Sequence, residues 1–186
     1  MDFESTGYRP LSAERCAIMR ELPIRKPNRL KGYDYSKNGA YFITVCVKNK
    51  HEMLGNVVVG DAALGVPFVK QSLYGEIANS FVKNIPKANP GTSVPHYVIM
   101  PNHIHLILLV CMTNDDGTPR AAYPTKQLIP KIINALKGLS SKKAGFSLWQ
   151  RSYHDHIIRN ENEYNRIAEY IDNNPMLWEN DCFYPK

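Results

Sequence analysis

Two histidines in this sequence have the spacing of a metal-binding pair. His103 and His105 stand at i and i+2 at the head of 103–110, an apolar stretch whose composition predicts a β-strand. Alternate residues of a strand point to the same face, so we expect the two imidazoles to lie side by side while Ile104 and Leu106 face the core. Neutral imidazole is a common ligand of divalent metals, but the pair also fits two histidines that bond to backbone carbonyls at a strand end. A metal site therefore needs ligands from elsewhere in the chain.

The C-terminal part of the chain offers such a ligand. Apolar residues recur at helical spacing from Tyr164 to Ile171, and Asn160 with Glu163 resembles a capping box, so we predict a helix from 161 to Pro175. Tyr170 and Asn174 lie one turn apart on the flank of this helix. There Asn174 can offer a carbonyl oxygen to a metal ion beside the phenol of Tyr170. By itself a tyrosine four residues before an asparagine is a common pair.

The elements that must position these residues alternate in type. The pattern predicts strands at 41–47, 95–100 and 103–110, the last two joined as a hairpin by Pro101-Asn102, and a short strand within 55–65. It predicts helices at 73–85, ended by Pro86, at 129–143, and in the C-terminal segment. Residues 113–124 read as a loop, 149–158 as extended or irregular, and 1–28 as an irregular N-terminal arm. This order favours an α+β sandwich with a mostly antiparallel sheet.

Composition excludes several classes of protein. The chain has 186 residues, of which 44% are hydrophobic and 22% charged, as expected for a globular domain with a sizeable core. No apolar stretch approaches the roughly 20 residues of a membrane-spanning helix, and the N-terminus has no apolar signal segment. The four cysteines form no C-x-x-C pair, so the expectation is a reduced, cytoplasmic chain that does not associate with a membrane.

Positive charge is concentrated in two parts of the chain. Residues 117–154 contain seven Lys and Arg and no Asp or Glu, and residues 20–50 contain eight against two. A positive face of this kind suits a polyphosphate such as nucleic acid, although a solvated helix face gives the same pattern. We expect DNA contacts from the following basic residues: Arg29, Lys31, Lys126, Lys131, Lys137, Lys142, Lys143 and Arg151.

Other chemical motifs are absent or incomplete. Gly60 and Gly65 have the spacing of a phosphate-binding P-loop, but Val66 and Pro67 replace the required Lys and Ser or Thr. His51-Glu52 begins like a zinc-protease motif and then lacks the second histidine. The chain has no G-x-G-x-x-G or G-x-S-x-G sequence, so no nucleotide cofactor is expected.

Several short motifs together resemble a known family. They occur in one order: Pro-Asn-His-Ile-His-Leu at 101–106, Trp-Gln at 149–150, His-Ile-Ile-Arg-Asn at 156–160 and Glu-Tyr-Ile-Asp-Asn-Asn-Pro at 169–175. With the segments 29–36 and 39–44, this combination resembles the REP-associated tyrosine transposases, which are single-tyrosine members of the HUH superfamily. The resemblance covers residues 29–178, which it identifies as one domain with a ferredoxin-like HUH-endonuclease fold, leaving 179–186 as a tail.

The resemblance implies a metal-dependent enzyme that cleaves and joins single-stranded DNA, often near hairpins. His103 and His105 match its paired metal ligands, Tyr170 its nucleophile, and Asn174 the position that completes the metal site, where many relatives have Gln. Mg²⁺ or Mn²⁺ is the implied cofactor, and attack by the tyrosine gives a 5′-phosphotyrosine and a free 3′-hydroxyl. His156 and Arg159 match supporting positions.

Three functions remain open at this point. The first is the transposase-like enzyme, acting as a monomer or a homodimer on single-stranded DNA. The second is a single-stranded nucleic-acid-binding module of the same fold without catalysis, and the third is a metal phosphodiesterase that uses water as the nucleophile. The order of the histidines, tyrosine and asparagine favours the first.

Overall fold

A computed structural model gives the structure, which describes residues 33–59, 65–112 and 127–185. Its main sheet has the strand order β4-β6-β1-β7, and β5 also pairs with β6. The strands are β4 (Thr92–Ser93), β5 (Tyr97–Ile99), β6 (His103–Val110), β1 (Gly39–Cys46) and β7 (His154–Ile158), and all of the pairings are antiparallel. A separate hairpin joins β2 (Gly55–Val59) to β3 (Pro67–Gln71).

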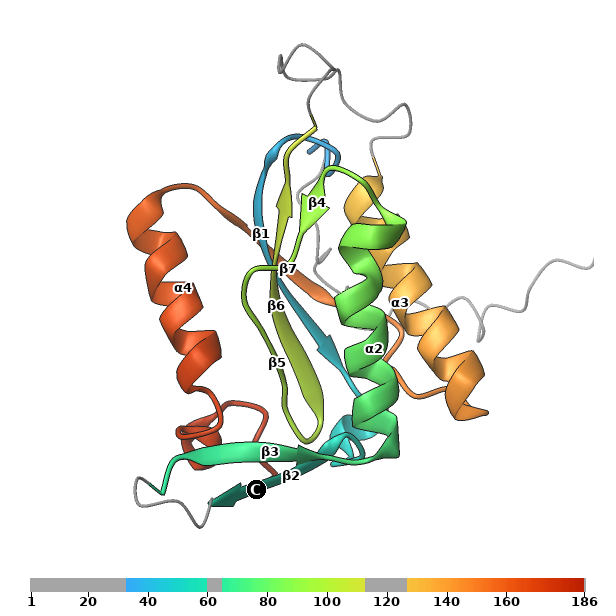
Figure 1. The fold of residues 1–186 in the computed structure, drawn as a ribbon, viewed down its shortest axis with the longest axis vertical. Coiled ribbons are helices and arrows are strands. Elements are labelled where there is room, and N and C mark those ends of the chain that lie inside the picture. The colour runs from blue at the N-terminus through green and yellow to red at the C-terminus, as the bar shows by residue number, and fades with distance from the viewer. Residues whose placement is uncertain (1–32, 60–64, 113–126, 186) are drawn as a thin grey trace, which may run out of the picture.

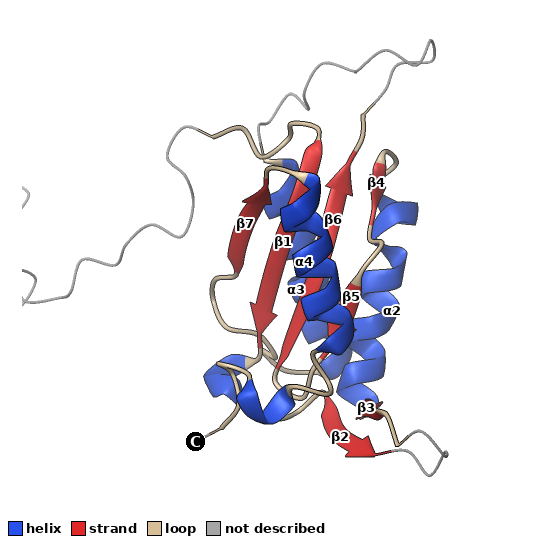
Figure 2. Ribbon diagram, turned by 90° about the vertical axis from the view of Figure 1, so that its left-hand side faces the viewer, coloured by secondary structure: helices blue, strands red, loops and turns tan. Residues whose placement is uncertain are grey.

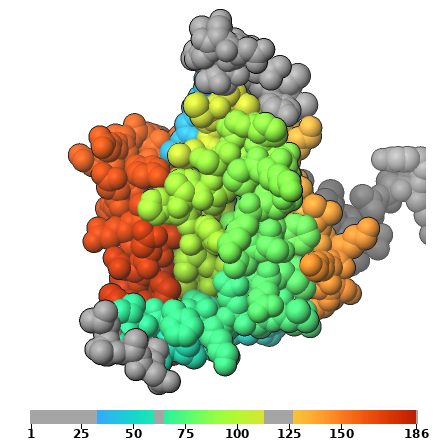
Figure 3. Space-filling view, in the orientation of Figure 1, coloured from blue at the N-terminus to red at the C-terminus, as the bar shows by residue number. Residues whose placement is uncertain are grey.

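Three helices cover the two faces of this sheet. Helices α2 (Leu73–Ala88) and α3 (Leu128–Ala144) lie on one face, and α4 (Glu161–Asn173) lies on the other (Figure 1). Figure 2 shows the same layers from the side, with α4 in front of the sheet and β7 at its edge. In the space-filling view, the β2–β3 hairpin lies along the bottom of the molecule and continues into the surface of α2 (Figure 3). The structure is therefore an α+β sandwich with an antiparallel sheet, as the sequence predicts.

Alternation along β1 and β6 builds a separate core on each face. Tyr41, Ile43 and Val45 of β1 are buried with the even-numbered residues of β6 against α2 and α3. On the opposite face, Ile107 of β6 packs with Ile171 and its neighbours in α4, and this core is smaller. His103 and His105 share the second face with Ile107 because residues two apart on a strand point the same way. The apolar pattern of β6 thus places both histidines under α4.

Several predicted elements are confirmed, with one correction to a boundary. The β5–β6 hairpin and the three helices lie where the patterns place them, and the Asn160 side chain caps α4 by accepting from the Glu163 amide at 2.8 Å. The prediction that Pro86 ends the helix that begins at residue 73 is wrong, because α2 continues through it to Ala88. A proline near the end of a helix removes only one N–H bond, and the Asn89 side chain bonds the Ile85 carbonyl at 2.9 Å. The patterns also missed β3 and β4.

Other predictions fall partly outside the described residues. The N-terminal arm 1–28, the loop 113–124, and Arg29, Lys31 and Lys126 lie there. No helix in the described part of the chain combines the length and apolar character needed to cross a membrane.

Candidate functional site

The two histidines of β6 meet beneath α4. His103 is fully buried and His105 is 2% exposed, and their ring centroids are 4.3 Å apart. Their partners across β1 are Cys46 and Thr44, respectively. The imidazoles are therefore held side by side on a rigid central strand, as the sequence predicts.

Neighbouring polar groups fix the orientation of each ring. The Asn102 side-chain amide donates to the Phe183 carbonyl at 2.8 Å, so its Oδ1 faces Nδ1 of His103 at 2.8 Å and accepts a hydrogen bond from it. This bond leaves Nε2 of His103 with its lone pair, and Nε2 is buried without a protein partner. Nδ1 of His105 lies 2.8 Å from Oγ1 of Thr44, which orients the second ring. Such bonds to the far nitrogen are typical of metal-binding histidines.

Burial keeps both imidazoles neutral. Loss of water around the rings lowers the pKa of His103 to about 4 and the pKa of His105 to about 3, and the proximity of His103 lowers the latter further. Neutral rings are the form that binds a metal ion, so the site needs no deprotonation near pH 7.

Helix α4 brings the predicted tyrosine and asparagine to the histidines. The Tyr170 hydroxyl lies 3.3 Å from Nε2 of His105, and the two ring centroids are 5.3 Å apart. Asn174 is fully buried at the C-cap of α4, and its Oδ1 has no protein partner. Phe42 of β1 packs against both His105 and Tyr170 and so supports the phenol from the side. The structure therefore brings together the four residues that the sequence singled out.

Asp181 joins this group although the sequence did not point to it. Its Oδ2 accepts hydrogen bonds from the Tyr170 hydroxyl and the Asn174 amide, each at 2.9 Å. Its Oδ1 accepts from the Phe183 backbone N–H at 2.7 Å. Burial alone raises the pKa of Asp181, but the bonds from Phe183 and Asn174 outweigh burial, and the pKa falls below the ordinary value. Asp181 is thus a carboxylate at neutral pH.

The same carboxylate holds the phenol in its protonated form. Burial, followed by the negative charge of Asp181, raises the pKa of Tyr170 well above 10. The segment that carries Asp181 belongs to the site on other grounds too, because the Phe183 ring packs on His103 with centroids 4.6 Å apart. The segment 179–185 therefore packs on the candidate site through Asp181 and Phe183. The boundary of the domain at residue 178 stays a prediction.

These donors fit a divalent metal ion. Ligand atoms of His103, His105 and Asp181 all lie within 4.8 Å of one another. The buried and unpartnered Nε2 of His103 and Oδ1 of Asn174 are lone-pair atoms without a proton donor, which a bound cation would satisfy. Imidazole nitrogen with amide and carboxylate oxygen suits ions such as Mn²⁺. Asp181 enlarges the predicted ligand set by one anionic oxygen.

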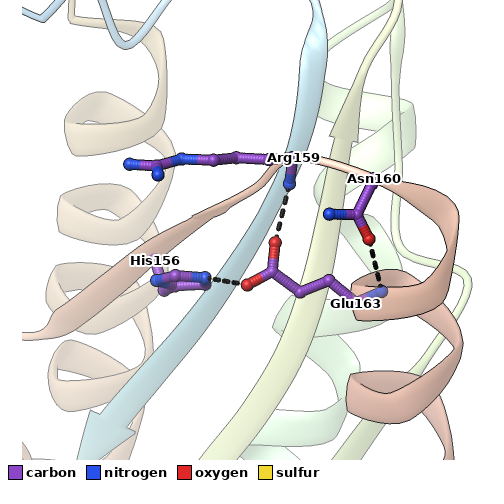
Figure 4. Close-up of polar contacts among 4 residues, drawn as sticks. All are labelled: His156, Arg159, Asn160 and Glu163. Atoms are coloured by element: carbon purple, nitrogen blue, oxygen red, sulfur yellow. Dashed lines mark hydrogen bonds and ion pairs between the residues drawn. The ribbon is translucent and has the colours of Figure 1, made fainter.

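A second pair of histidines, His154 and His156, lies apart from this cluster on the edge strand β7. His156 bonds Glu163 at 2.7 Å, and the other oxygen of Glu163 accepts from the Arg159 backbone N–H at 2.8 Å (Figure 4). These bonds tie the start of α4 to β7, while the Arg159 side chain points away from Glu163 (Figure 4). His156 therefore contacts the helix that carries Tyr170, and it does so at the opposite end of that helix.

The predicted DNA-binding cations that the structure describes do not line the histidine site. Lys131, Lys142 and Lys143 are exposed on α3, on the other side of the sheet. Lys137 donates to the carbonyls of Gln150, Arg151 and Ser152, so its ammonium is engaged with the backbone. The Arg151 side chain is exposed beside β7.

Comparison with known proteins places the chain among transposases. No family model matches the sequence. The chain is 35% identical over 174 residues to an uncharacterized protein of Haemophilus influenzae, covering 86% of this chain and 93% of that protein. It is 23% identical over 146 residues (77% and 73%) to a protein of the same organism assigned as a REP-associated tyrosine transposase. The named relative confirms the resemblance of this sequence to the REP-associated tyrosine transposases.

A second named relative and a solved structure agree with this resemblance. The chain is 29% identical over 154 residues to the ISDra2 transposase TnpA of Deinococcus radiodurans, covering 76% of this chain and 88% of that protein. The solved structure of a REP-associated tyrosine transposase bound to a REP hairpin covers 82% of this chain and 73% of its own, with 17% identity and a TM-score of 0.56. That likeness shows that the two chains share a fold. The family relationship supports a transposase-like function.

Proposed function

We propose that this protein cleaves and rejoins single-stranded DNA, with Tyr170 as the nucleophile. The observation that carries the proposal is the position of the Tyr170 hydroxyl, 3.3 Å from Nε2 of His105 and beside two buried lone-pair atoms, Nε2 of His103 and Oδ1 of Asn174. A phenol next to a set of potential metal donors suits attack on a phosphodiester. The named transposase relatives support the same reaction class.

The reaction exchanges one phosphoester for another. The Tyr170 oxygen forms a bond to the phosphorus as the bond from phosphorus to the 3′-oxygen breaks. This leaves a 5′-phosphotyrosine and a 3′-oxygen that takes up a proton from water to become a 3′-hydroxyl. The phenolic proton points to Oδ2 of Asp181 at 2.9 Å, so this carboxylate is placed to receive it as the attack proceeds. Because the number of phosphoester bonds is unchanged, a 3′-hydroxyl can reverse the step and join strands.

His103, His105 and Asn174, with Asp181 beside them, would hold the Mg²⁺ or Mn²⁺ ion. When bound, the ion supplies a Lewis acid for a non-bridging phosphate oxygen. Thr44 and Asn102 keep the imidazoles oriented, and Asp181 keeps the Asn174 amide turned so that its oxygen stays available.

The proposed substrate is single-stranded DNA next to a hairpin. A REP hairpin is bound in the solved structure of the family member, and the excess of Lys and Arg in this chain suits a polyphosphate. The candidate catalytic residues all come from one chain, so a monomer contains a complete site and a homodimer is the second possibility.

The test uses labelled single-stranded hairpin oligonucleotides with Mn²⁺ or Mg²⁺, followed by a denaturing gel. We expect a metal-dependent covalent protein–DNA band that is lost in Tyr170→Phe while DNA binding remains. Cleavage that survives Tyr170→Phe without a covalent band would instead favour a phosphodiesterase that uses water. Binding without cleavage by the wild-type protein would favour a non-catalytic module.

A further inference from the structure

A polar groove opens where β7 separates from β1. The Gln150 backbone N–H donates to the Cys46 carbonyl at 2.9 Å, and pairing with β1 resumes at His154, opposite Thr44. Between these points the chain leaves the strand and encloses a hollow of about 660 Å³. We call it the β1–β7 groove; its lining residues are Cys46, Lys48, Asn49, Gln150, Arg151, Ser152, Tyr153 and His154.

The groove lies one strand away from the candidate catalytic site. Cys46 and Thr44 on β1 are the direct cross-strand partners of His103 and His105. Adjacent strands are roughly 5 Å apart, and the Thr44 hydroxyl bridges this distance to His105 by its 2.8 Å bond. Helix α4 packs on β5 and β6, and its bond to β7 is made at His156, two residues beyond the groove.

The charge of the groove suits a phosphate backbone. Lys48 and Arg151 are exposed on the rim of the groove, and the imidazole of His154 also lines it. None of the eight described residues that line it is acidic. A concave surface lined by cations focuses their field and attracts polyanions more strongly than the same charges on a convex surface.

Lys137 gives the rim a defined shape. Its ammonium donates to three successive carbonyls, those of Gln150, Arg151 and Ser152, the last two at 3.1 and 3.0 Å. Because the three carbonyl oxygens converge on one ammonium, all of them point toward α3. The positive charge of Lys137 therefore compensates their partial negative charges. Lys137 thus fixes the backbone of residues 150–152 from the α3 side, and this holds Arg151 at the rim of the groove.

We infer that the β1–β7 groove binds the single-stranded DNA backbone that flanks the scissile phosphodiester, with Lys48 and Arg151 each contacting a phosphate. The inference rests on the proposed function, which sets the scissile phosphate at His103 and His105. A neighbouring hollow shares Gln150 and Arg151 and reaches Lys142 at the end of α3. Positively charged side chains therefore continue along the path of the DNA strand as it leaves the candidate site.

The test measures binding of a single-stranded oligonucleotide by fluorescence anisotropy at several salt concentrations, in the Tyr170→Phe background so that no cleavage intervenes. The test variant is Lys48→Ala/Arg151→Ala. The matched control is Lys83→Ala/Lys87→Ala, which removes two exposed lysines from α2 on the other face of the sheet. A charge-retaining variant, Lys48→Arg/Arg151→Lys, completes the set, and circular dichroism verifies that every variant is folded.

Each phosphate contact to a single strand contributes about 0.7 to the slope of log K against log salt. Loss of two contacts should therefore reduce the steepness of this slope by about 1.4. The ratio of parent affinity to variant affinity should then be roughly 25-fold larger at 0.1 M salt than at 1 M salt. The control and the charge-retaining variant should bind like the parent protein. An equal loss in the test variant and in the control would overturn the inference.

The outcome is separable from that of the proposed function. If wild-type protein forms the covalent band and Lys48→Ala/Arg151→Ala binds normally, the groove assignment is wrong and the reaction stands. If wild-type protein never forms the band but this variant loses binding as calculated, the groove assignment stands for a binding module.

Discussion

Removal of the Asp181 carboxylate should loosen the candidate site more than any other single change in the C-terminal segment. Asp181 accepts from Tyr170, Asn174 and the Phe183 backbone, so Asp181→Ala leaves three donors without their acceptor. Hydrogen bonds to a charged group contribute about 1.5–3 kcal/mol each. Because Asp181 is half-exposed, we use the lower value for the two side-chain donors, which gives about 3 kcal/mol.

This loss can be measured by urea unfolding of the metal-free protein, followed by tryptophan fluorescence, to which the buried Trp178 contributes. With a slope of about 2 kcal/mol per molar urea, the midpoint should fall by about 1.5 M. Titration with Mn²⁺ should show affinity reduced by about 10- to 100-fold, because the Asn174 amide loses the bond that orients it.

The matched control is Asp172→Ala, which removes an exposed carboxylate of α4 that bonds His96 at 3.1 Å. Exposed pairs of this kind contribute under about 1 kcal/mol. If Asp181→Ala and Asp172→Ala had equal urea midpoints and equal Mn²⁺ affinities, the structural role given to Asp181 would be refuted.

Three further predictions follow from the same geometry. The metal-free protein should lose stability as the pH falls below about 6.5, because the unfolded chain then protonates two histidines whose folded pKa values are about 4 and 3. The cost at pH 5 is about 2 kcal/mol for each histidine, and His103→Gln/His105→Gln should flatten this dependence in denaturant titrations; an unchanged slope would contradict it. Thr44→Val should keep the fold but weaken Mn²⁺ binding about tenfold, since His105 loses its orienting hydroxyl; Thr92→Val, a buried threonine remote from the histidines in strand register, serves as the control, and equal affinities would argue against this role. Lys137→Met should lower the unfolding free energy by about 2 kcal/mol, because three carbonyls lose one charged donor; Lys131→Met, at an exposed position of the same helix, should change it by less than about 0.5 kcal/mol.

The parts of the fold that depend on local pattern could be predicted from the sequence. The alternation along 103–110 gave both the strand and the shared face of His103 and His105, and helical spacing placed Tyr170 and Asn174 on one flank. Pro86 was misread because a proline close to the end of a helix removes only one backbone hydrogen bond, and α2 ends two residues after it.

Asp181 could not be found in this way because it lies beyond the last helix, in a segment without periodicity. Its position depends on contacts distant in sequence, such as the bond from the Asn102 amide to the Phe183 carbonyl across 81 residues. The tertiary structure also gave Lys137 a partner that its charge did not suggest, since a lysine in a basic helix resembles a DNA contact until the carbonyls of 150–152 are placed around it. For Asp181, the only signal in the sequence was a carboxylate near the end of a short polar tail.

The central claim is that Tyr170 attacks a DNA phosphodiester. The most direct measurement is mass spectrometry of a protease digest after incubation with a single-stranded hairpin oligonucleotide and Mn²⁺. We predict that a nucleotide adduct is found on the peptide containing Tyr170, and that neither the metal-free sample nor Tyr170→Phe carries it. An adduct on another tyrosine, or cleaved DNA with no adduct on any peptide, would contradict the account.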